Sequence, residues 1–234
     1  MVCAEPGRAL QLVPLHTRSC YSFGFGVTPV EKLVERSLAV GLNSLALTDR
    51  DNLCGQILFH KLARDRGLHP VTGVELNFCT EKNPAGRLVL LARDREGYSN
   101  LCKIITRKKC HEEQPGAASG NMDLEAGQCA GLFLMTDSVV VADSLVDSGL
   151  DPAAMRLLLV RPDPITPESR LLSAARRLSI PLLADPDIVF LDPGHHLLHR
   201  LSAAISKKAL LSDTRQAKRL TASKERYFAG PRLW

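Results

Sequence analysis

The sequence lacks the paired cysteines that a disulfide framework or a zinc ribbon requires. Its seven cysteines are odd in number and scattered, and none forms a C-x-x-C pair. Zinc ribbons and disulfide-rich folds depend on regular cysteine spacings. The absence of such spacings fits a reducing compartment, and we therefore expect a cytoplasmic protein.

Long apolar runs are also missing. A membrane-spanning helix needs about 18 or more consecutive apolar residues, and a signal peptide needs a continuous apolar segment near its start. The sequence has no run of that length, and its opening MVCAEPGRALQLVPLH is interrupted by polar residues. We expect neither a membrane span nor a signal peptide.

Three common catalytic motifs are absent. The sequence has no Walker A loop, no G-x-S-x-G and no G-x-G-x-x-G following a strand, so the usual apparatus of P-loop NTPases, serine hydrolases and dinucleotide-binding enzymes is not present. The net charge of +5 permits contact with nucleic acid and is too small to imply it.

Apolar segments alternate with helical ones along most of the chain. Helices are predicted over 28–42, with Thr28 as N-cap and Pro29 as the first helical residue, and over 55–68. A polar, Gly-rich loop or insertion is predicted over 111–128. Strands are predicted over 10–16, 44–48, 69–78, 87–92, 131–135, 155–160 and 180–184. This alternation is typical of a parallel sheet or an α/β barrel.

In barrels of this kind, functional side chains come from the carboxyl ends of the strands and the loops that follow them. Polar residues stand at four such positions: His16 and Arg18, Asp49 and Arg50, Glu75, and Asp187. We therefore expect these side chains to converge at one mouth of the barrel.

Several ordered phrases carry a family resemblance. They are LHTRSCYSFGFGVTPVEKLVERSLAVGLNSLALTDRDNLCGQILFHKLARDRGLHPVTGVELNF (15–78), RLVLLARDREGYSNLCKII (87–105), PLLADPDIVFLDPGHHLLHRLSAAI (181–205) and ERYFAGPRLW (225–234). Together they resemble the polymerase-and-histidinol-phosphatase (PHP) domain, in the form found at the N-terminus of bacterial DNA polymerase III alpha subunits and error-prone DNA polymerases.

The resemblance implies a distorted (β/α)7 barrel over residues 1–205. It also implies that a basic tail, 206–234, resembles the lead-out toward a polymerase palm. In intact family members the mouth of the barrel holds up to three divalent metals, such as zinc or manganese, for phosphoester hydrolysis, because imidazoles and carboxylates bind these ions and leave room for a nucleophilic water.

The resemblance also identifies ligand positions. His16, Glu75 and Asp187 match the family's ligands, whereas four other ligand positions are substituted: Arg18, Phe25, Arg50 and Val189. A guanidinium has no lone pair to offer a metal and keeps its positive charge. We therefore expect a degenerate site without a metal cofactor, in which Arg18 and Arg50 pair with the remaining carboxylates and with Asp49.

Three other interpretations stay open. A single zinc or manganese ion could bind through His16, Glu75 and Asp187, or Arg18 and Arg50 could hold a phosphate. The cluster HHLLH (195–199) could also suggest a metal site, but it lies at a helix start outside the strand ends. We favour a solvated or core-edge role for it.

These observations lead to a function hypothesis. We expect a non-catalytic PHP domain of the DNA polymerase III alpha type, acting as a scaffold or interaction module in DNA replication or repair. Polymerase or nuclease subunits are the expected partners, with weak DNA contact through the basic tail 207–234. Because the sequence ends at Trp234, we expect no polymerase palm and no polymerase activity. The alternative is a metal-dependent phosphoesterase or 3′–5′ exonuclease with an altered ligand set.

Overall fold

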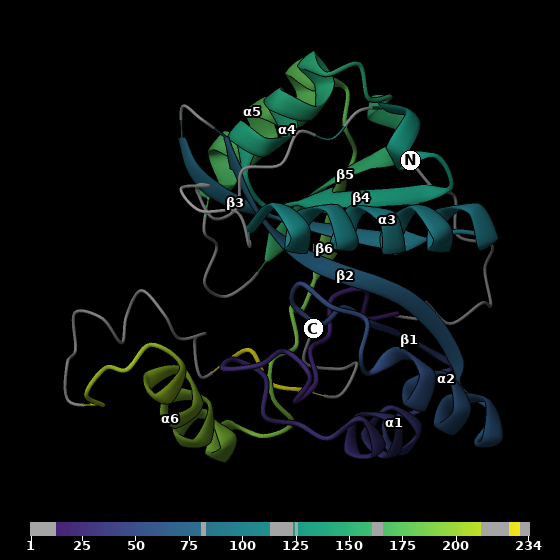
Figure 1. Ribbon diagram of the computed structural model, residues 1–234, viewed down its shortest axis with the longest axis vertical. Coiled ribbons are helices and arrows are strands. Elements are labelled where there is room, and N and C mark those ends of the chain that lie inside the picture. Colours follow the sequence, from purple (N-terminus) through teal and green to yellow (C-terminus); the bar gives the residue numbers. More distant parts are fainter. Residues whose placement is uncertain are drawn as a thin grey trace.

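One curled sheet of six strands, in the order β1-β2-β3-β4-β5-β6, organises the chain (Figure 1). The computed structural model describes residues 13–80, 83–112, 124, 126–160, 166–211 and 225–229. The strands are β1 (Ser44–Leu47), β2 (His69–Thr80), β3 (Asn83–Ala92), β4 (Leu132–Thr136), β5 (Met155–Val160) and β6 (Leu182–Asp185). Six of the seven predicted strands are therefore confirmed, with ends shifted by a few residues.

The sheet is mixed, which corrects the expectation of a parallel one. β1 pairs parallel with β2, and β4, β5 and β6 run parallel to one another. β3, by contrast, is antiparallel to both β2 and β4. No helix separates β2 from β3, and two strands joined without a crossover must run in opposite directions.

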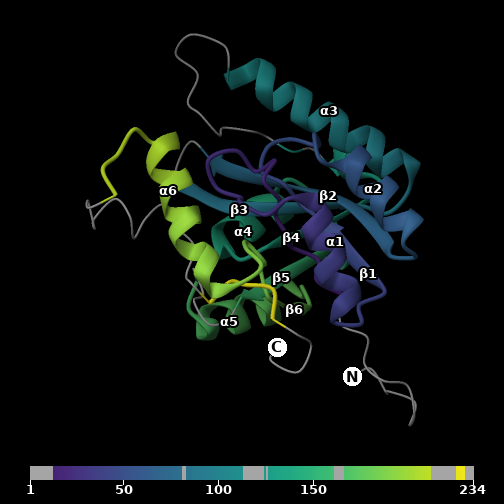
Figure 2. The same cartoon turned by 90° about the horizontal axis from the view of Figure 1, so that it is seen from below.

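Of the helices that the structure describes, five, α1 to α5, pack on the outside of the curled sheet, whereas a sixth, α6, packs on the segments around Phe25 and Phe190 (Figure 2). They are α1 (Val30–Ala39), α2 (Gln56–Asp65), α3 (Arg95–Glu112), α4 (Val139–Asp147), α5 (Glu168–Leu178) and α6 (His196–Ser206), with 3-10 turns at Ala126–Cys129, Pro152–Ala154 and Pro193–His195. No helix within the described ranges is long and apolar enough to span a membrane.

The first helix begins later than predicted. α1 starts at Val30, so Pro29 is the N-cap, and no side chain caps the helix there. Thr28 therefore lies one residue before the cap, and the prediction that it is the N-cap is wrong. The predicted loop over 111–128 is described only at its edges: residues 111–112 end α3 and Ala126–Cys129 form a 3-10 turn, and the remainder, apart from residue 124, lies outside the described residues.

Two apolar clusters hold the helices against the sheet. The larger lies between the sheet and α3, α4 and α5, and the second lies between β1 and the helices α1 and α2. Buried leucines and valines dominate both clusters, and removing this apolar surface from water is the main force that holds such layers together.

Of the predicted first strand, 10–16, residues 10–12 lie outside the described residues, and residues 13–16 form no regular strand. The segment 14–18 nevertheless lies beside β1, because the N–H groups of Ala46 and Thr48 donate to the carbonyl oxygens of Pro14 and Thr17 (3.0 and 2.8 Å). On its other side, Ile188 N donates to His16 O (2.8 Å) and Arg18 N donates to Ile188 O (3.0 Å). The chain that follows β6 therefore approaches β1 through this segment, giving a half-barrel with an irregular seventh position.

Residues 225–229, which the sequence assigns to the tail, pack against this closure. Val189 N donates to Arg226 O (3.0 Å), and Phe228 N donates to Phe190 O (2.8 Å). Phe228 is fully buried in the cluster that also contains Leu33. This stretch of the tail thus forms part of the core.

Candidate functional site

Arg18 lies at the centre of a buried group of charges. Its Nε donates to Glu75 Oε2 (2.7 Å) and its Nη1 donates to Asp187 Oδ1 (2.5 Å). His16 Nε2 lies 2.6 Å from the same Glu75 oxygen, and His16 Nδ1 lies 3.3 Å from Asp187 Oδ1. All four side chains are fully buried. The segment 14–18, β2 and the turn after β6 therefore bring these residues to one point, as the sequence predicts.

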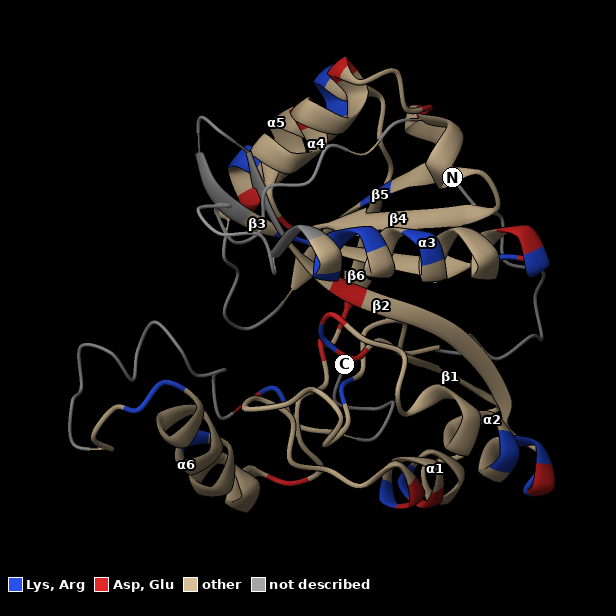
Figure 3. Cartoon of the chain, viewed as in Figure 1, with Lys and Arg blue, Asp and Glu red and all other residues tan. Residues whose placement is uncertain are grey.

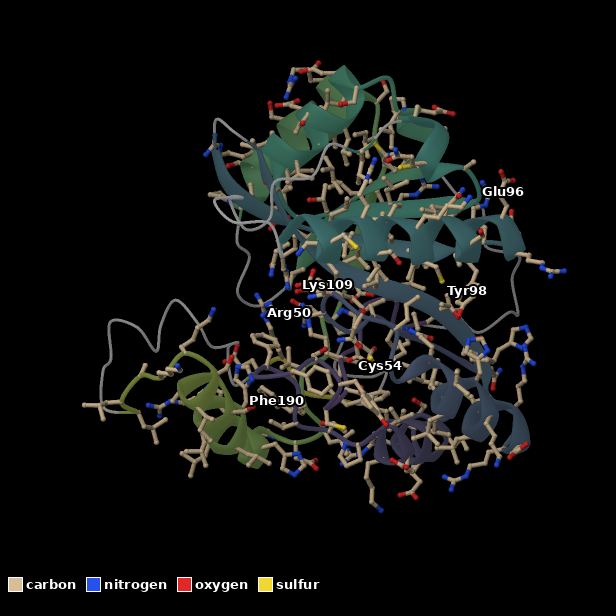
Figure 4. The ribbon with its side chains drawn as sticks, in the orientation of Figure 1. Arg50, Cys54, Glu96, Tyr98, Lys109 and Phe190 are labelled. Carbon is tan, nitrogen blue, oxygen red and sulfur yellow. The ribbon has the colours of Figure 1, made fainter. Side chains whose placement is uncertain are left out.

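Arg50 reaches the same carboxylate from the loop after β1. Its Nε donates to Glu75 Oε1 at 2.5 Å, and its guanidinium carbon lies 3.5 Å from the centre of the Phe25 ring. A cation over an aromatic face is attracted by the ring's quadrupole. The neighbouring Asp51 forms an ion pair with Lys108 of α3 (2.9 Å), so the Arg50 loop lies against the C-terminal half of that helix (Figure 4).

Asp187 also binds two arginines that the sequence reasoning missed. Its Oδ2 accepts from Arg87 Nη1 (2.7 Å) and from Arg226 Nη1 (2.6 Å). Arg87 in turn donates from Nε to Asp137 Oδ2 (3.0 Å). The network therefore contains the arginines Arg18, Arg50, Arg87 and Arg226 and the carboxylates Glu75, Asp137 and Asp187.

The turn before Asp187 positions its carboxylate. Asp187 adopts a left-handed backbone with φ of 49°, a conformation that short polar side chains tolerate better than most. Its N–H donates to Asp185 Oδ1 (2.9 Å), and the other Asp185 oxygen accepts from Leu15 N (2.8 Å). Burial raises the pKa of Asp185 to about 7. Asp185 thus fastens this turn to the segment 14–18.

The arginines reverse the effect of burial on the two central carboxylates. Burial alone would raise the pKa of Glu75, but the charges of Arg18 and Arg50 outweigh it and hold that pKa well below its usual value. The pKa of Asp187 is likewise lowered because Arg18 and Arg87 outweigh burial. For His16, burial and the Arg18 charge lower the pKa. At neutral pH the site therefore holds two carboxylates and an uncharged imidazole.

Asp49 is held by serines, which corrects the expectation that it pairs with the arginines. Ser19 donates to both its oxygens, from N to Oδ1 (2.7 Å) and from Oγ to Oδ2 (2.8 Å). Ser22 Oγ adds a bond to Oδ1 (2.6 Å). Burial raises the pKa of Asp49 despite these bonds. Asp49 therefore shapes the loop 19–22 beside the site.

Phe25 and Val189, the two apolar residues at expected ligand positions, lie together, and Arg18 and Arg50 contact the Phe25 ring. Phe25 and Val189 belong to one small cluster with Phe190. His199 of the HHLLH cluster lies against it, 4.6 Å from the Phe25 ring, and its Nδ1 is 2.6 Å from Phe25 O. Burial lowers the pKa of His199 to about 4. The favoured core-edge role of this histidine is confirmed.

A divalent metal does not fit the donors as they are arranged. The guanidinium of Arg18 donates to both carboxylates that, with His16, would surround a cation, and a guanidinium cannot serve as a ligand. Across the described ranges, no group of three or more His, Cys, Asp or Glu side chains is placed to hold a metal ion. What the arrangement does provide is a charge-assisted hydrogen-bond network.

Comparisons with known proteins agree with this architecture. Residues 14–139 match the PHP domain family. The chain is 33% identical over 240 residues to the error-prone DNA polymerase of Anaeromyxobacter sp. (strain K), covering 94% of this chain and 21% of that protein. It is 29% identical over 226 residues to DNA polymerase III subunit alpha of Buchnera aphidicola subsp. Schizaphis graminum (strain Sg), covering 88% of this chain and 20% of the relative. The chain thus spans about a fifth of the length of these relatives.

Solved structures with low sequence identity share the fold. One is a protein of Bifidobacterium adolescentis ATCC 15703 that is proposed to be a metal-dependent phosphoesterase, with a TM-score of 0.53, 14% identity, and coverage of 76% of this chain and 88% of that one. Another is an amidohydrolase from Chromobacterium violaceum, with a TM-score of 0.51, 14% identity, and coverage of 76% and 87%. The family match extends over more than half of the chain, and the curled sheet agrees with it: the protein belongs to the PHP domain family.

Proposed function

We propose that this chain is a non-catalytic PHP domain of the DNA polymerase III alpha type, which acts as a scaffold or interaction module in DNA replication or repair. The observation that carries the proposal is the position of Arg18, whose guanidinium donates to Glu75 and Asp187 at the point where His16 also converges. In this proposal His16, Glu75 and Asp187 are remnant ligand positions, and arginines take over the charge-balancing role of metals.

The charge balance of the network supports this role. Buried carboxylates are costly unless they are paired and hydrogen-bonded. The side chains of Glu75 and Asp187 are fully buried, and arginines contact both oxygens of each. A metal would have to displace cations that already satisfy these oxygens, so the pairing opposes metal binding.

The proposed partners are polymerase or nuclease subunits, because the matched relatives are DNA polymerases. We also propose weak DNA contact through the tail 207–234, where Lys and Arg outnumber the acidic residues Asp213 and Glu225. Binding of this kind depends on released counterions and weakens steeply as salt rises.

The direct test combines metal content with activity. Protein purified without chelator is assayed by mass spectrometry for zinc, manganese and iron, and for hydrolysis of p-nitrophenyl phosphate and of a 3′-labelled oligonucleotide with added Mn²⁺ or Zn²⁺. We expect a folded protein with substoichiometric metal and no turnover. Stoichiometric metal with turnover that disappears in His16→Ala would overturn the proposal and favour a phosphoesterase or 3′–5′ exonuclease.

A further inference from the structure

The helix α6 presents an apolar face to solvent. Leu197, Leu198, Leu201 and Ile205 are 61%, 50%, 45% and 71% exposed, and Leu210, just after the helix, is 78% exposed. The four helical residues lie within one side of the helix because positions 197, 201 and 205 recur every four residues. We call Leu197, Leu198, Leu201 and Ile205 the α6 face. Scattered exposed leucines are common on proteins, whereas a contiguous stripe marks a contact surface.

The opposite side of α6 fixes this orientation. His199 and Ala203 are buried, and the His199 ring sits between Phe25 and Phe190, at 4.6 and 6.0 Å. Its Nδ1 lies 2.6 Å from Phe25 O. Phe190 accordingly lies beside α6 (Figure 4). Rotating the helix to bury its leucines would break these contacts, so the α6 face stays outward.

Exposed positive charge borders the C-terminal end of the α6 face, and Asp192, the acidic residue that precedes the helix, forms an ion pair with Arg36 (2.8 Å). Residues 193–211 contain no Asp or Glu. In Figure 3, α6 is mostly tan, and the coloured part of the helix is blue. Arg200 Nη2 donates to Leu211 O (3.2 Å), whereas Lys207 and Lys208 are exposed at the end of the helix. A ligand complementary to this surface would carry an apolar stripe and acidic side chains opposite Lys207 and Lys208.

We propose that the α6 face docks an acidic amphipathic helix of a partner protein. This inference rests on the proposed role as an interaction module and identifies the surface and the chemistry of its partner. Leu197, Leu201 and Ile205 are four residues apart, and apolar residues at this helical spacing are the contacts by which amphipathic helices bind a partner. Acidic side chains on the incoming helix would pair with Lys207 and Lys208.

A second copy of the chain is a poor occupant. Two copies that met through this helix would bring the exposed cations Lys207 and Lys208 of both chains to the same interface, and like charges brought together oppose association. A membrane surface is disfavoured as well, because helices that bind at lipid interfaces carry many Lys and Arg residues along their polar side, whereas α6 contains only Arg200.

The test uses a synthetic 18-residue peptide with leucines at helical spacing and glutamates on its flanks, labelled for fluorescence anisotropy. We expect saturable binding to the full chain that weakens about tenfold or more in Leu201→Gln/Ile205→Gln, as for central contact residues. The matched control is Ile57→Gln on α2, where Ile57 is 82% exposed, and it should bind like the unmodified protein.

Charge is tested separately. Lys207→Glu/Lys208→Glu should weaken binding of the acidic peptide by several-fold, whereas Arg176→Glu on α5 should not. A version of the peptide with lysine in place of glutamate should bind more weakly than the acidic one. Equal binding of both peptides, or no effect of Leu201→Gln/Ile205→Gln, would overturn the proposal.

The competing occupants give distinct results. A dimer in light scattering that Leu201→Gln/Ile205→Gln dissociates would assign the α6 face to a second copy, and binding to anionic vesicles lost in the same variant would assign it to a lipid surface. Either result overturns the partner proposed here. Absence of peptide binding in a metal-free, inactive protein would reject the docking surface alone, whereas metal-dependent turnover would reject the proposed function whatever the peptide does.

Discussion

Arg18 and Asp187, 169 positions apart in the sequence, are joined by a hydrogen bond of 2.5 Å from Nη1 to Oδ1. The bond connects the first described segment of the chain to the turn after the last strand of the sheet. It is fully buried, so neither charge can be satisfied by water. The closure of the half-barrel and the chemistry of its centre therefore depend on the same pair.

Breaking this pair from one side should destabilise the protein strongly. Asp187→Asn leaves the buried Arg18 and Arg87 short of their shared partner, and removal of one member of a buried ion pair typically costs about 3–5 kcal/mol. Denaturant titration measures the loss in free energy of unfolding. Glu35→Gln, which removes an exposed pair with Lys32, should cost far less, because solvent already screens that pair. Similar losses in the two variants would contradict the central role of Asp187.

Restoring imidazoles should create metal affinity. In Arg18→His/Arg50→His/Val189→His, three side chains that cannot bind a metal become ligands next to His16 and Glu75. We expect bound zinc or manganese by mass spectrometry and a melting temperature that rises with added metal. The control Arg18→Gln/Arg50→Gln/Val189→Ala removes the same side chains without supplying imidazole. If the histidine variant binds no more metal than this control, the positions do not correspond to a ligand set.

Stability should depend on pH through His199. Its folded-state pKa is lowered to about 4 by burial, whereas an unfolded histidine titrates near about 6.5. The unfolded chain therefore binds the additional proton first, so the contribution of His199 is complete above about pH 6.5 and is lost as the pH falls toward 4.

Comparison with His199→Asn isolates this effect, because the other titrating groups are common to both proteins. The difference in free energy of unfolding between the two proteins should shrink by up to about 3 kcal/mol between pH 7.5 and 4. Urea titrations at several pH values give this difference. A difference that does not change with pH would mean that His199 is not buried in its neutral form.

The tail should contribute to the stability of the whole domain. Phe228 is fully buried, and replacing a buried phenylalanine with alanine costs about 3–5 kcal/mol. Phe228→Ala should therefore lower the free energy of unfolding in a single cooperative transition. Leu210→Ala, at a residue that is 78% exposed, should change it by no more than about 0.5 kcal/mol. An unchanged midpoint for Phe228→Ala would show that residues 225–229 do not pack in solution as described here.

Sequence reasoning located strands best where apolar residues are continuous. The runs LFLM and MRLLLV are short and are followed by the polar residues Thr136 and Arg161, and they form most of β4 and all of β5. The direction of β3 does not follow from the alternating pattern, because that pattern predicts helical connections between parallel strands, whereas β3 is antiparallel to β2 and β4. Thr80 of β2 pairs with Asn83 of β3, and the only sequence signal of this reversal is that no helical pattern separates the two strands.

The same reversal explains the site residue that was hardest to predict. Arg87 is the first residue of the apolar run RLVLLA. In a parallel strand, this amino-terminal position would lie at the opposite end of the barrel from the functional site. In the antiparallel register it pairs with Asn77, near the carboxyl end of β2, and so reaches Asp187. Asp137, by contrast, directly follows β4, so the strand-end rule could have identified it. Arg226 lies in the basic tail, and nothing local distinguishes it from the other cations there.

The attachment of residues 225–229 has a consequence for the buried charges. Their backbone bonds to Val189 and Phe190 place Arg226 in a fixed position against Asp187. Arg226 and Arg87 donate to the same oxygen of Asp187. The last described stretch of the chain therefore completes the charge balance of a carboxylate at the centre of the site, and a chain that ended before this stretch would leave that oxygen with one arginine fewer.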